Sequence, residues 1–113
     1  MNLTKKDRKV ARSIIEKGLL QEFANGLTQF DGILQQWKDQ SMETREAYQK
    51  MYSKVRTFDK HIAQRYDGMK GSNYLTIISL QLYDKVIAED DIDELSEESQ
   101  ERVYQLVNFY RMP

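Results

Sequence analysis

The sequence predicts an all-α protein, a small helical bundle of about four helices built on a long antiparallel helical hairpin. Three observations support this fold class. Apolar residues recur at intervals of three and four along two long segments, as they do on one face of a helix. Five glycines and a single proline are too few turn residues for a fold of many strands. A length of 113 residues suits a single helical domain, residues 1–113, with its own core.

The first long helix is expected to follow Thr4, whose side chain can cap it. Its later part carries five apolar residues spaced 4, 3, 4 and 3 apart, a coiled-coil-like seam: Phe23, Leu27, Phe30, Leu34 and Trp37. The segment "ANGLTQFD" allows an alternative, in which Asn25-Gly26 ends one helix and Thr28 begins another. We favour a single helix because the seam keeps its phase across this segment.

A second helix follows a short polar turn, with Ser41 as the expected cap. Its apolar residues are also spaced 3 and 4 apart: Tyr48, Met51, Val55, Phe58 and Ile62. Two such helices joined by a short turn form an antiparallel hairpin. If Trp37 lies beside Thr44, Tyr66 should lie near Ile15, and Gly68 should follow the end of the helix.

Two shorter helices complete the predicted bundle. The segment from residue 74 to 87 is apolar on more than one side, which favours a well-buried helix, although "ISLQLY" alternates as a strand would. A last helix should begin after a capping Ser96 and bury Val103, Val107 and their neighbours.

The loop "DGMKGSN" has the glycines, lysine and serine of a phosphate-binding loop, and it precedes an apolar segment. It lacks the spacing of the nucleotide-binding loop that follows a strand, because Lys70 stands before the second glycine. We therefore interpret it as the stop of one helix and the start of the next, with Ser72 or Asn73 as the cap.

The charges are unevenly distributed, although the net charge is −1. The first seventy residues carry a net +5 and the rest −6, with seven acidic residues between Glu89 and Glu98. The predicted layout lets the N-terminal helix run past the end of the second helix, and it places the acidic run at the opposite end. The expected basic pole is a candidate interaction surface: Lys5, Lys6, Arg8, Lys9, Arg12, Arg65 and Lys70.

Several classes of site are excluded or disfavoured. Without cysteine there is no disulfide, no thiol nucleophile and no thiolate metal site. His61 is the single histidine and is interpreted as a packing residue, so no catalytic residue, cofactor or metal is expected. The acidic run fails the calcium-loop pattern, since Ser96 stands where glycine is required. No apolar run approaches the ~18 residues of a membrane span, and no signal peptide is evident, which predicts a soluble, cytoplasmic protein.

The expected function is a non-enzymatic protein–protein interaction, structural or regulatory module that self-associates, with a homodimer favoured over another protein partner. Two arguments support self-association. The overhanging N-terminal helix should not be able to bury its apolar stripe within one chain, and opposite charged poles suit antiparallel or head-to-tail pairing. The alternative is a nucleic-acid-binding accessory protein that uses the basic pole, although a pI of about 5.8 is low for that role.

Overall fold

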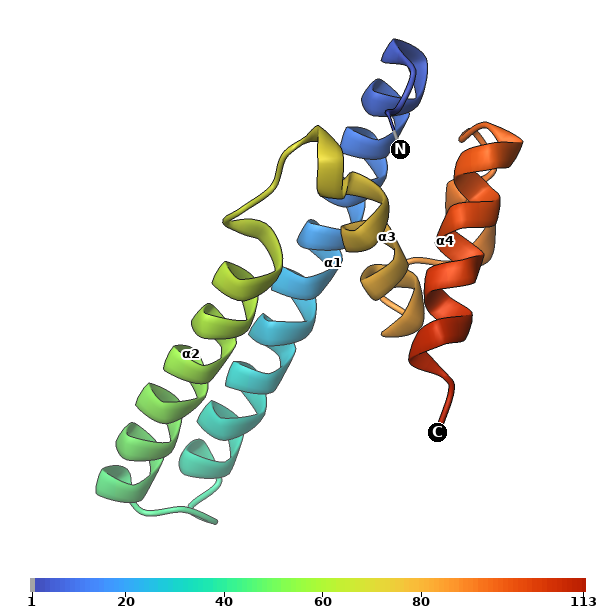
Figure 1. The fold of residues 1–113 in the computed structure, drawn as a ribbon. Helices are drawn as coiled ribbons and strands as arrows, with labels where there is room; N and C mark the ends of the chain where they lie inside the picture. The colour runs from blue at the N-terminus through green and yellow to red at the C-terminus, as the bar shows by residue number, and fades with distance from the viewer. Residues whose placement is uncertain (1) are drawn as a thin grey trace. The chain divides into compact units, whose positions relative to one another are not determined.

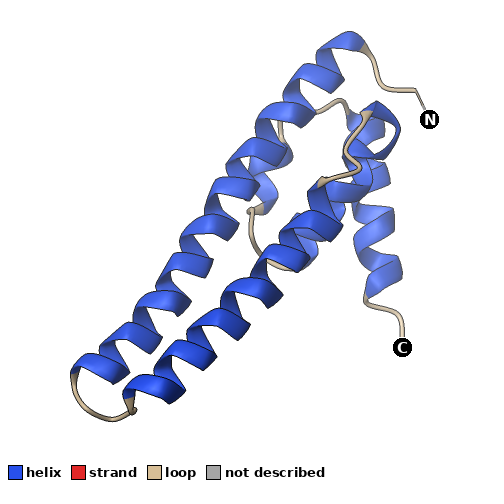
Figure 2. Cartoon of the chain, turned by 90° about the vertical axis from the view of Figure 1, so that its left-hand side faces the viewer, coloured by secondary structure: helices blue, strands red, loops and turns tan. Residues whose placement is uncertain are grey.

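The computed structural model describes residues 2–113, and these residues form four α-helices, two short 3-10 helices and no strand (Figure 1, Figure 2). The predicted all-α class and the number of helices are confirmed. The helices are α1 (Lys5–Lys38), α2 (Thr44–Tyr66), α3 (Tyr74–Tyr83) and α4 (Glu97–Tyr110), with η1 (Gly71–Asn73) and η2 (Glu89–Ile92) between them. Among these helices, none combines the length and the apolar content that crossing a bilayer requires.

The chain divides into two compact units, and α1 contributes to both. Unit 1 contains the described residues up to Gln21 together with Gly68–Pro113, and unit 2 is Glu22–Asp67. Unit 2 is an antiparallel hairpin of α1 and α2, joined by a short turn (Figure 2). Unit 1 combines the first half of α1 with α3 and α4.

The helix α1 is continuous through Asn25-Gly26, as favoured from the phase of its apolar residues. Gly26 is buried, and a Cβ atom at this position would lie 2.6–2.9 Å from three atoms of the Phe58 ring. The absence of a side chain at Gly26 therefore allows α2 to approach α1 closely. The Phe58 ring also meets Phe30 edge to face, with ring centroids 5.7 Å apart.

The contacts along the hairpin differ from the predicted register at one end. The indole Nε1 of Trp37 donates to the hydroxyl of Thr44 at 3.0 Å, so these residues are neighbours as expected. Tyr66 instead donates its hydroxyl to Glu22, so its expected position near Ile15 was wrong. The expected cap was also wrong, because Glu43 is the N-cap and Ser41 donates its backbone N–H to Asp39 within the turn.

On α1 the predicted seam is displaced by one residue from the buried line of the hairpin. The buried residues of unit 2 on α1 are Glu22, Gly26 and Ile33. Much of the predicted seam is exposed: Phe23, Leu27, Leu34, Trp37, Tyr48 and Val55. Phe30, Met51, Phe58 and Ile62 are half-buried. The residues with heptad spacing are not the buried ones on α1, because the close contact at Gly26 turns a different side of this helix toward α2.

Unit 1 has an apolar core between its helices. Its most buried residues are Ala11, Ile78, Ile92, Val103 and Val107, each at most 1% exposed. The predicted well-buried helix at 74–83 is confirmed, since seven residues of α3 are buried. The amide of Gln81 reaches α1 and donates to the carbonyl of Ile15 at 3.1 Å.

The connection from α2 to α3 is a helix stop followed by a helix start, as interpreted from the loop. The side chain of Asn73 closes it: Oδ1 accepts from the backbone N–H of Lys70 at 2.9 Å, and Nδ2 donates to the carbonyl of Gly68 at 2.9 Å. The cap of α4 is also confirmed, because the hydroxyl of Ser96 accepts from the backbone N–H of Ser99 at 3.3 Å.

Two predictions about the N-terminal half of α1 were wrong. Ala11, Ile14 and Ile15 are at most 6% exposed within unit 1, so the stripe of the expected overhang is covered, whereas Leu20 stays exposed. The acidic run lies along this half of α1 and not at an opposite pole, because Lys17 pairs with Asp91 in η2. Both errors have one cause, since α3 and α4 pack beside the N-terminal part of α1.

We expect Gly26→Ala to reduce stability relative to Gly32→Ala, which alters the same helix at a site with no other atom within 4 Å. A methyl group at residue 32 should raise the free energy of unfolding by up to about 1 kcal/mol through helix propensity. At residue 26 the same gain is offset by overpacking against Phe58, which costs about 1–3 kcal/mol. Urea denaturation of both variants measures the difference, and equal stabilisation by the two substitutions would contradict the close contact.

Asp7 supplies a pH-dependent prediction. Burial raises the pKa of this carboxyl, but hydrogen bonds from Ser96 and Ser99 outweigh that effect and lower it below the ordinary value of 3.8. The stabilisation is therefore fully present above that value and is lost as the pH falls through the lower folded-state pKa. Asp7→Asn should cost about 1.5–3 kcal/mol at neutral pH.

The test compares urea denaturation of wild type and Asp7→Asn at neutral and strongly acidic pH, with Asp59→Asn, an exposed site, as the control. The difference between wild type and Asp7→Asn should shrink in acid. A difference that does not change with pH would rule out a stabilising charge on Asp7.

Candidate interaction surfaces

The N-terminal cations of the predicted basic pole lie on the surface of unit 1. Lys5, Lys6, Arg8, Lys9 and Arg12 are all exposed residues of α1. Four of them occupy positions i, i+3, i+4 and i+7, which share one side of a helix. We call these four, Lys5, Arg8, Lys9 and Arg12, the basic face.

The acidic residue among these cations points into the protein. Asp7 is 3% exposed, and its carboxylate accepts three hydrogen bonds from the start of α4. The backbone N–H of Ser96 donates at 2.9 Å, the hydroxyl of Ser96 at 2.5 Å and the hydroxyl of Ser99 at 2.6 Å. A carboxylate is favourable beside a helix N-terminus, which carries partial positive charge. The exposed charges from residue 5 to residue 12 are consequently all positive.

The two remaining residues of the predicted pole have different environments. Lys70 is exposed in the loop of unit 1, next to Gly71. The Cδ atom of Arg8 is 3.7 Å from where a Cβ of Gly71 would be, so the loop and the basic face are neighbours. Arg65 belongs to unit 2, its side chain is 9% exposed, and its Nη1 is 3.2 Å from Oε1 of Glu22. It is part of the hairpin interior and does not contribute an exposed cation.

Glu22 is the centre of a buried polar cluster that the sequence did not reveal. Its Oε1 lies 2.7 Å from Nε2 of His61 and 3.2 Å from Nη1 of Arg65, and Tyr66 donates its hydroxyl to Oε2. All three partners lie in the last turns of α2. His61 therefore has a polar role in addition to the packing role that was expected from its position beside Ile62. One sequence feature was consistent with this buried line but was not used, because Glu22, Gly26 and Ile33 also follow helical spacing.

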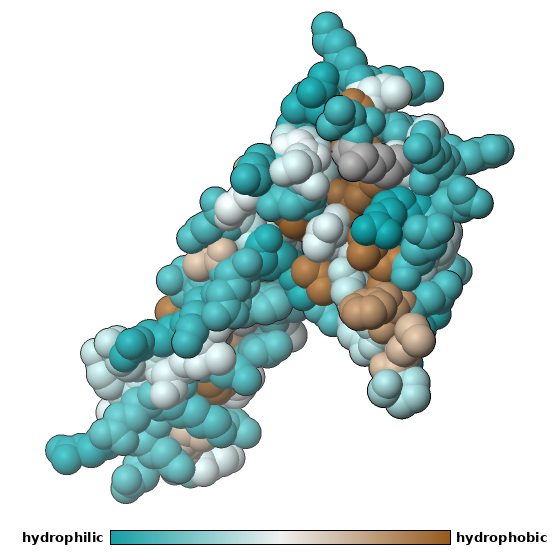
Figure 3. All heavy atoms as spheres, viewed as in Figure 1, coloured by the Kyte–Doolittle hydropathy of each residue, from teal (hydrophilic) through white to brown (hydrophobic). Residues whose placement is uncertain are grey.

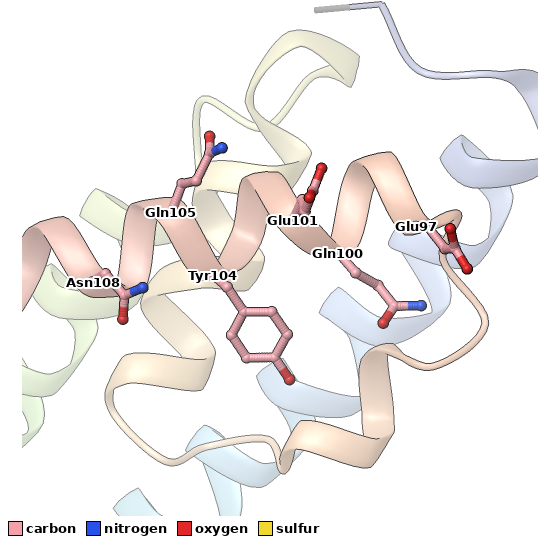
Figure 4. Close-up of a pocket in the computed structure, with 6 residues that line it drawn as sticks. All are labelled: Glu97, Gln100, Glu101, Tyr104, Gln105 and Asn108. Carbon is pink, nitrogen blue, oxygen red and sulfur yellow. The ribbon is translucent and has the colours of Figure 1, made fainter.

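An open hollow of about 290 Å³ adjoins this cluster. Polar residues line most of it, with Asn25 and Gln29 from α1 and Lys54 and Thr57 from α2. Both oxygens of Glu22 already have donors from α2, so the carboxylate is occupied in holding the two helices together. A second hollow lies along α4 (Figure 4), and all the side chains that line it come from that helix, among them Tyr104. One helix side cannot enclose a ligand.

The acidic run contributes structural contacts. Asp91 in η2 pairs with Lys17 and accepts from the backbone N–H of Ala88 at 2.7 Å. These two contacts lower the pKa of Asp91, and the hydrogen bond to Asp91 raises the pKa of Lys17. Within residues 2–113, no three histidine or acidic side chains are grouped as they would be around a metal ion.

The hairpin has an exposed apolar surface, and most of its residues belong to the seam that was expected to be buried. Its residues are between 40% and 74% exposed: Phe23, Leu27, Leu34 and Trp37 of α1 with Tyr48, Tyr52 and Val55 of α2. We call this set the apolar face. On the side of unit 2 seen in Figure 3 hydrophilic residues predominate, whereas hydrophobic residues gather around α3 and α4 in unit 1.

Helix geometry places the apolar face on one side of the hairpin. On α1, Phe23, Leu27 and Leu34 each directly follow a buried residue, so their line is turned by about 100° from the buried line. On α2, Tyr48 and Tyr52 directly follow the buried Ala47 and the half-buried Met51.

The rotation therefore has the same sense about each helix axis. Because the two helices are antiparallel, equal rotations about their own axes bring both lines to the same side. The residues that precede the buried positions, such as Asn25 on α1 and Glu46 on α2, are polar and belong to the opposite side.

No family of known proteins matches this chain, and no curated protein and no solved structure matches it either.

Proposed function

We propose that this chain is a non-enzymatic protein–protein interaction module and that the apolar face is its docking surface. The observation that supports this proposal is the exposure of seven large apolar side chains on one side of a two-helix hairpin. Soluble monomers rarely expose contiguous apolar patches of more than a few hundred Å². Covering such a patch gains roughly 25 cal/mol per Å², so the exposed hairpin has a strong tendency to bind a partner.

The composition of the apolar face also favours protein recognition. Four of its seven residues are aromatic, including Trp37, Tyr48 and Tyr52. Tryptophan, tyrosine and arginine are enriched among the residues that contribute most to protein–protein affinity. Arg56 lies at the edge of the face, with its guanidinium 5.7 Å from the centre of the Tyr52 ring. Charge is thus held at the rim while the centre is apolar, as in typical interfaces.

The buried carboxylates support a structural role and not a catalytic one. Asp7 and Glu22 each have both oxygens engaged by internal donors. A general base requires a position within hydrogen-bond reach of a substrate proton, and these oxygens are already bonded inside the protein. We also propose a cytoplasmic location, which the lack of cysteine supports.

Site-specific photo-crosslinking tests the docking surface in the native host. With p-benzoylphenylalanine in place of Tyr52, illumination should give covalent protein adducts, because residue 52 is in the centre of the apolar face. The matched control carries the same group in place of Ser53, which is exposed on the other side of α2. If adducts are absent at 52, or are equally abundant at both positions, the face is not a docking surface.

The second candidate function is a nucleic-acid-binding accessory protein that uses the basic face. It is supported by the four cations on one side of α1 and by the burial of Asp7, which removes the opposing charge from that surface. Lysine and arginine that neutralise phosphates release counterions, so such binding weakens steeply as salt is added.

Fluorescence polarisation with labelled generic DNA and RNA tests this candidate at about 50 mM salt. The double variant Lys5→Glu with Lys9→Glu should abolish binding. Lys50→Glu with Lys54→Glu makes the same change of charge on α2 and should not. Absence of binding by the wild type at this salt concentration would eliminate the candidate.

A further inference from the structure

We infer that the apolar face binds a second copy of this chain, with α1 of each copy packed on α2 of the other. This inference rests on the proposed function and adds to it the identity of the partner and the arrangement of the helices. It differs from the argument made from the sequence, because Ala11, Ile14 and Ile15 of the N-terminal half of α1 are already buried within unit 1.

The area of the apolar face suits a symmetric dimer. Large aromatic side chains bury about 150–250 Å² each, so seven large apolar side chains that are 40–74% exposed offer on the order of 700 Å² per copy. A stable interface of standard size buries about 800 Å² on each partner. Two copies of this face therefore supply nearly the required area without any contribution from elsewhere.

A twofold dimer also satisfies the requirement that the same surface serves both partners. The two hairpins would form a four-helix bundle, in which each helix has two neighbours. One neighbour of α1 is the α2 of its own chain, and the other is either α1 or α2 of the second copy.

Charge decides between these two arrangements. The helix α2 carries six basic residues, Arg45, Lys50, Lys54, Arg56, Lys60 and Arg65, and two acidic residues, Glu46 and Asp59. Placing α2 beside α2 of the second copy would bring two strongly positive helices together, which is unfavourable. Placing α1 on α2 moves the two α2 helices to opposite corners of the bundle.

The same arrangement brings opposite charges together at the rim. Asp31 is the one charged residue of α1 between Ala24 and Trp37, and it is exposed on the apolar side of that helix. The contacts of Gly26 with Phe58 and of Trp37 with Thr44 place Arg56 within one to two helical turns of the level of Asp31, roughly 5–9 Å along the axis, a span that the long arginine side chain can reach across. A twofold axis parallel to the helices keeps these levels, so Asp31 meets Arg56 of the other copy.

Analytical ultracentrifugation of the full chain tests the partner. We expect a dimer at micromolar concentration, and we expect Leu27→Glu with Tyr52→Glu to give a monomer. Ser53→Glu adds the same charge on the other side of α2 and should remain dimeric. Circular dichroism must show that each variant keeps its helix content, so that loss of the dimer is not loss of the fold.

Charge reversal tests the arrangement. Asp31→Arg should weaken the dimer by roughly 3- to 10-fold, and Asp31→Arg combined with Arg56→Asp should restore it. A dimer that is indifferent to both changes overturns the packing of α1 on α2. A dimer that survives Leu27→Glu with Tyr52→Glu overturns the use of the apolar face.

A wild-type chain that stays monomeric overturns the inference as a whole. In that case the crosslinking at residue 52 still decides the proposed function. Adducts whose mass corresponds to another protein would leave the interaction module standing, with a different partner. If the wild-type chain is instead a dimer, the adducts should appear at twice the 13.4 kDa mass of the chain.

Discussion

The close approach of Phe58 to Gly26 determines how the hairpin is organised. Because residue 26 has no side chain, the Phe58 ring lies directly against α1, and this contact fixes which side of each helix is turned inward. Glu22 and Ile33 share that side of α1 and become buried with it. The larger apolar residues, one position further along, are left outside. The lack of a side chain at residue 26 thus determines which side of α1 packs against α2 and which apolar side chains stay exposed.

Helical periodicity was sufficient to predict the elements but not the rotation of the helices about their axes. Spacing of apolar residues correctly gave one continuous α1, the apolar content of 74–83 gave a buried helix, and the residue type gave the Ser96 cap. It failed at the hairpin seam because a glycine and a carboxylate, neither of which counts as an apolar position, form part of the buried line. A prediction from hydrophobic spacing alone does not identify small residues or hydrogen-bonded polar side chains as buried.

The charge layout was missed for a related reason. The sequence gives the net charge of each part of the chain directly, but it does not give the position of that charge in the fold. The fold of unit 1 places the acidic run beside α1 through Lys17 and Asp91. One carboxylate within the net charge of the first seventy residues, Asp7, is buried against Ser96 and Ser99. Net charge describes a segment, whereas these contacts depend on which helix packs beside it. The candidate surfaces therefore required the three-dimensional structure.

The cluster around Glu22 has a consequence for the alignment of the hairpin. If α2 slipped by one helical turn along α1, the carboxylate would remain buried but lose His61 and Arg65, and stranding a buried charge costs about 3–5 kcal/mol. Slipped hairpins would then number on the order of one in a hundred or fewer. The cluster therefore fixes the alignment of α1 with α2, so that nearly all molecules present the same residues on the exposed side of the hairpin.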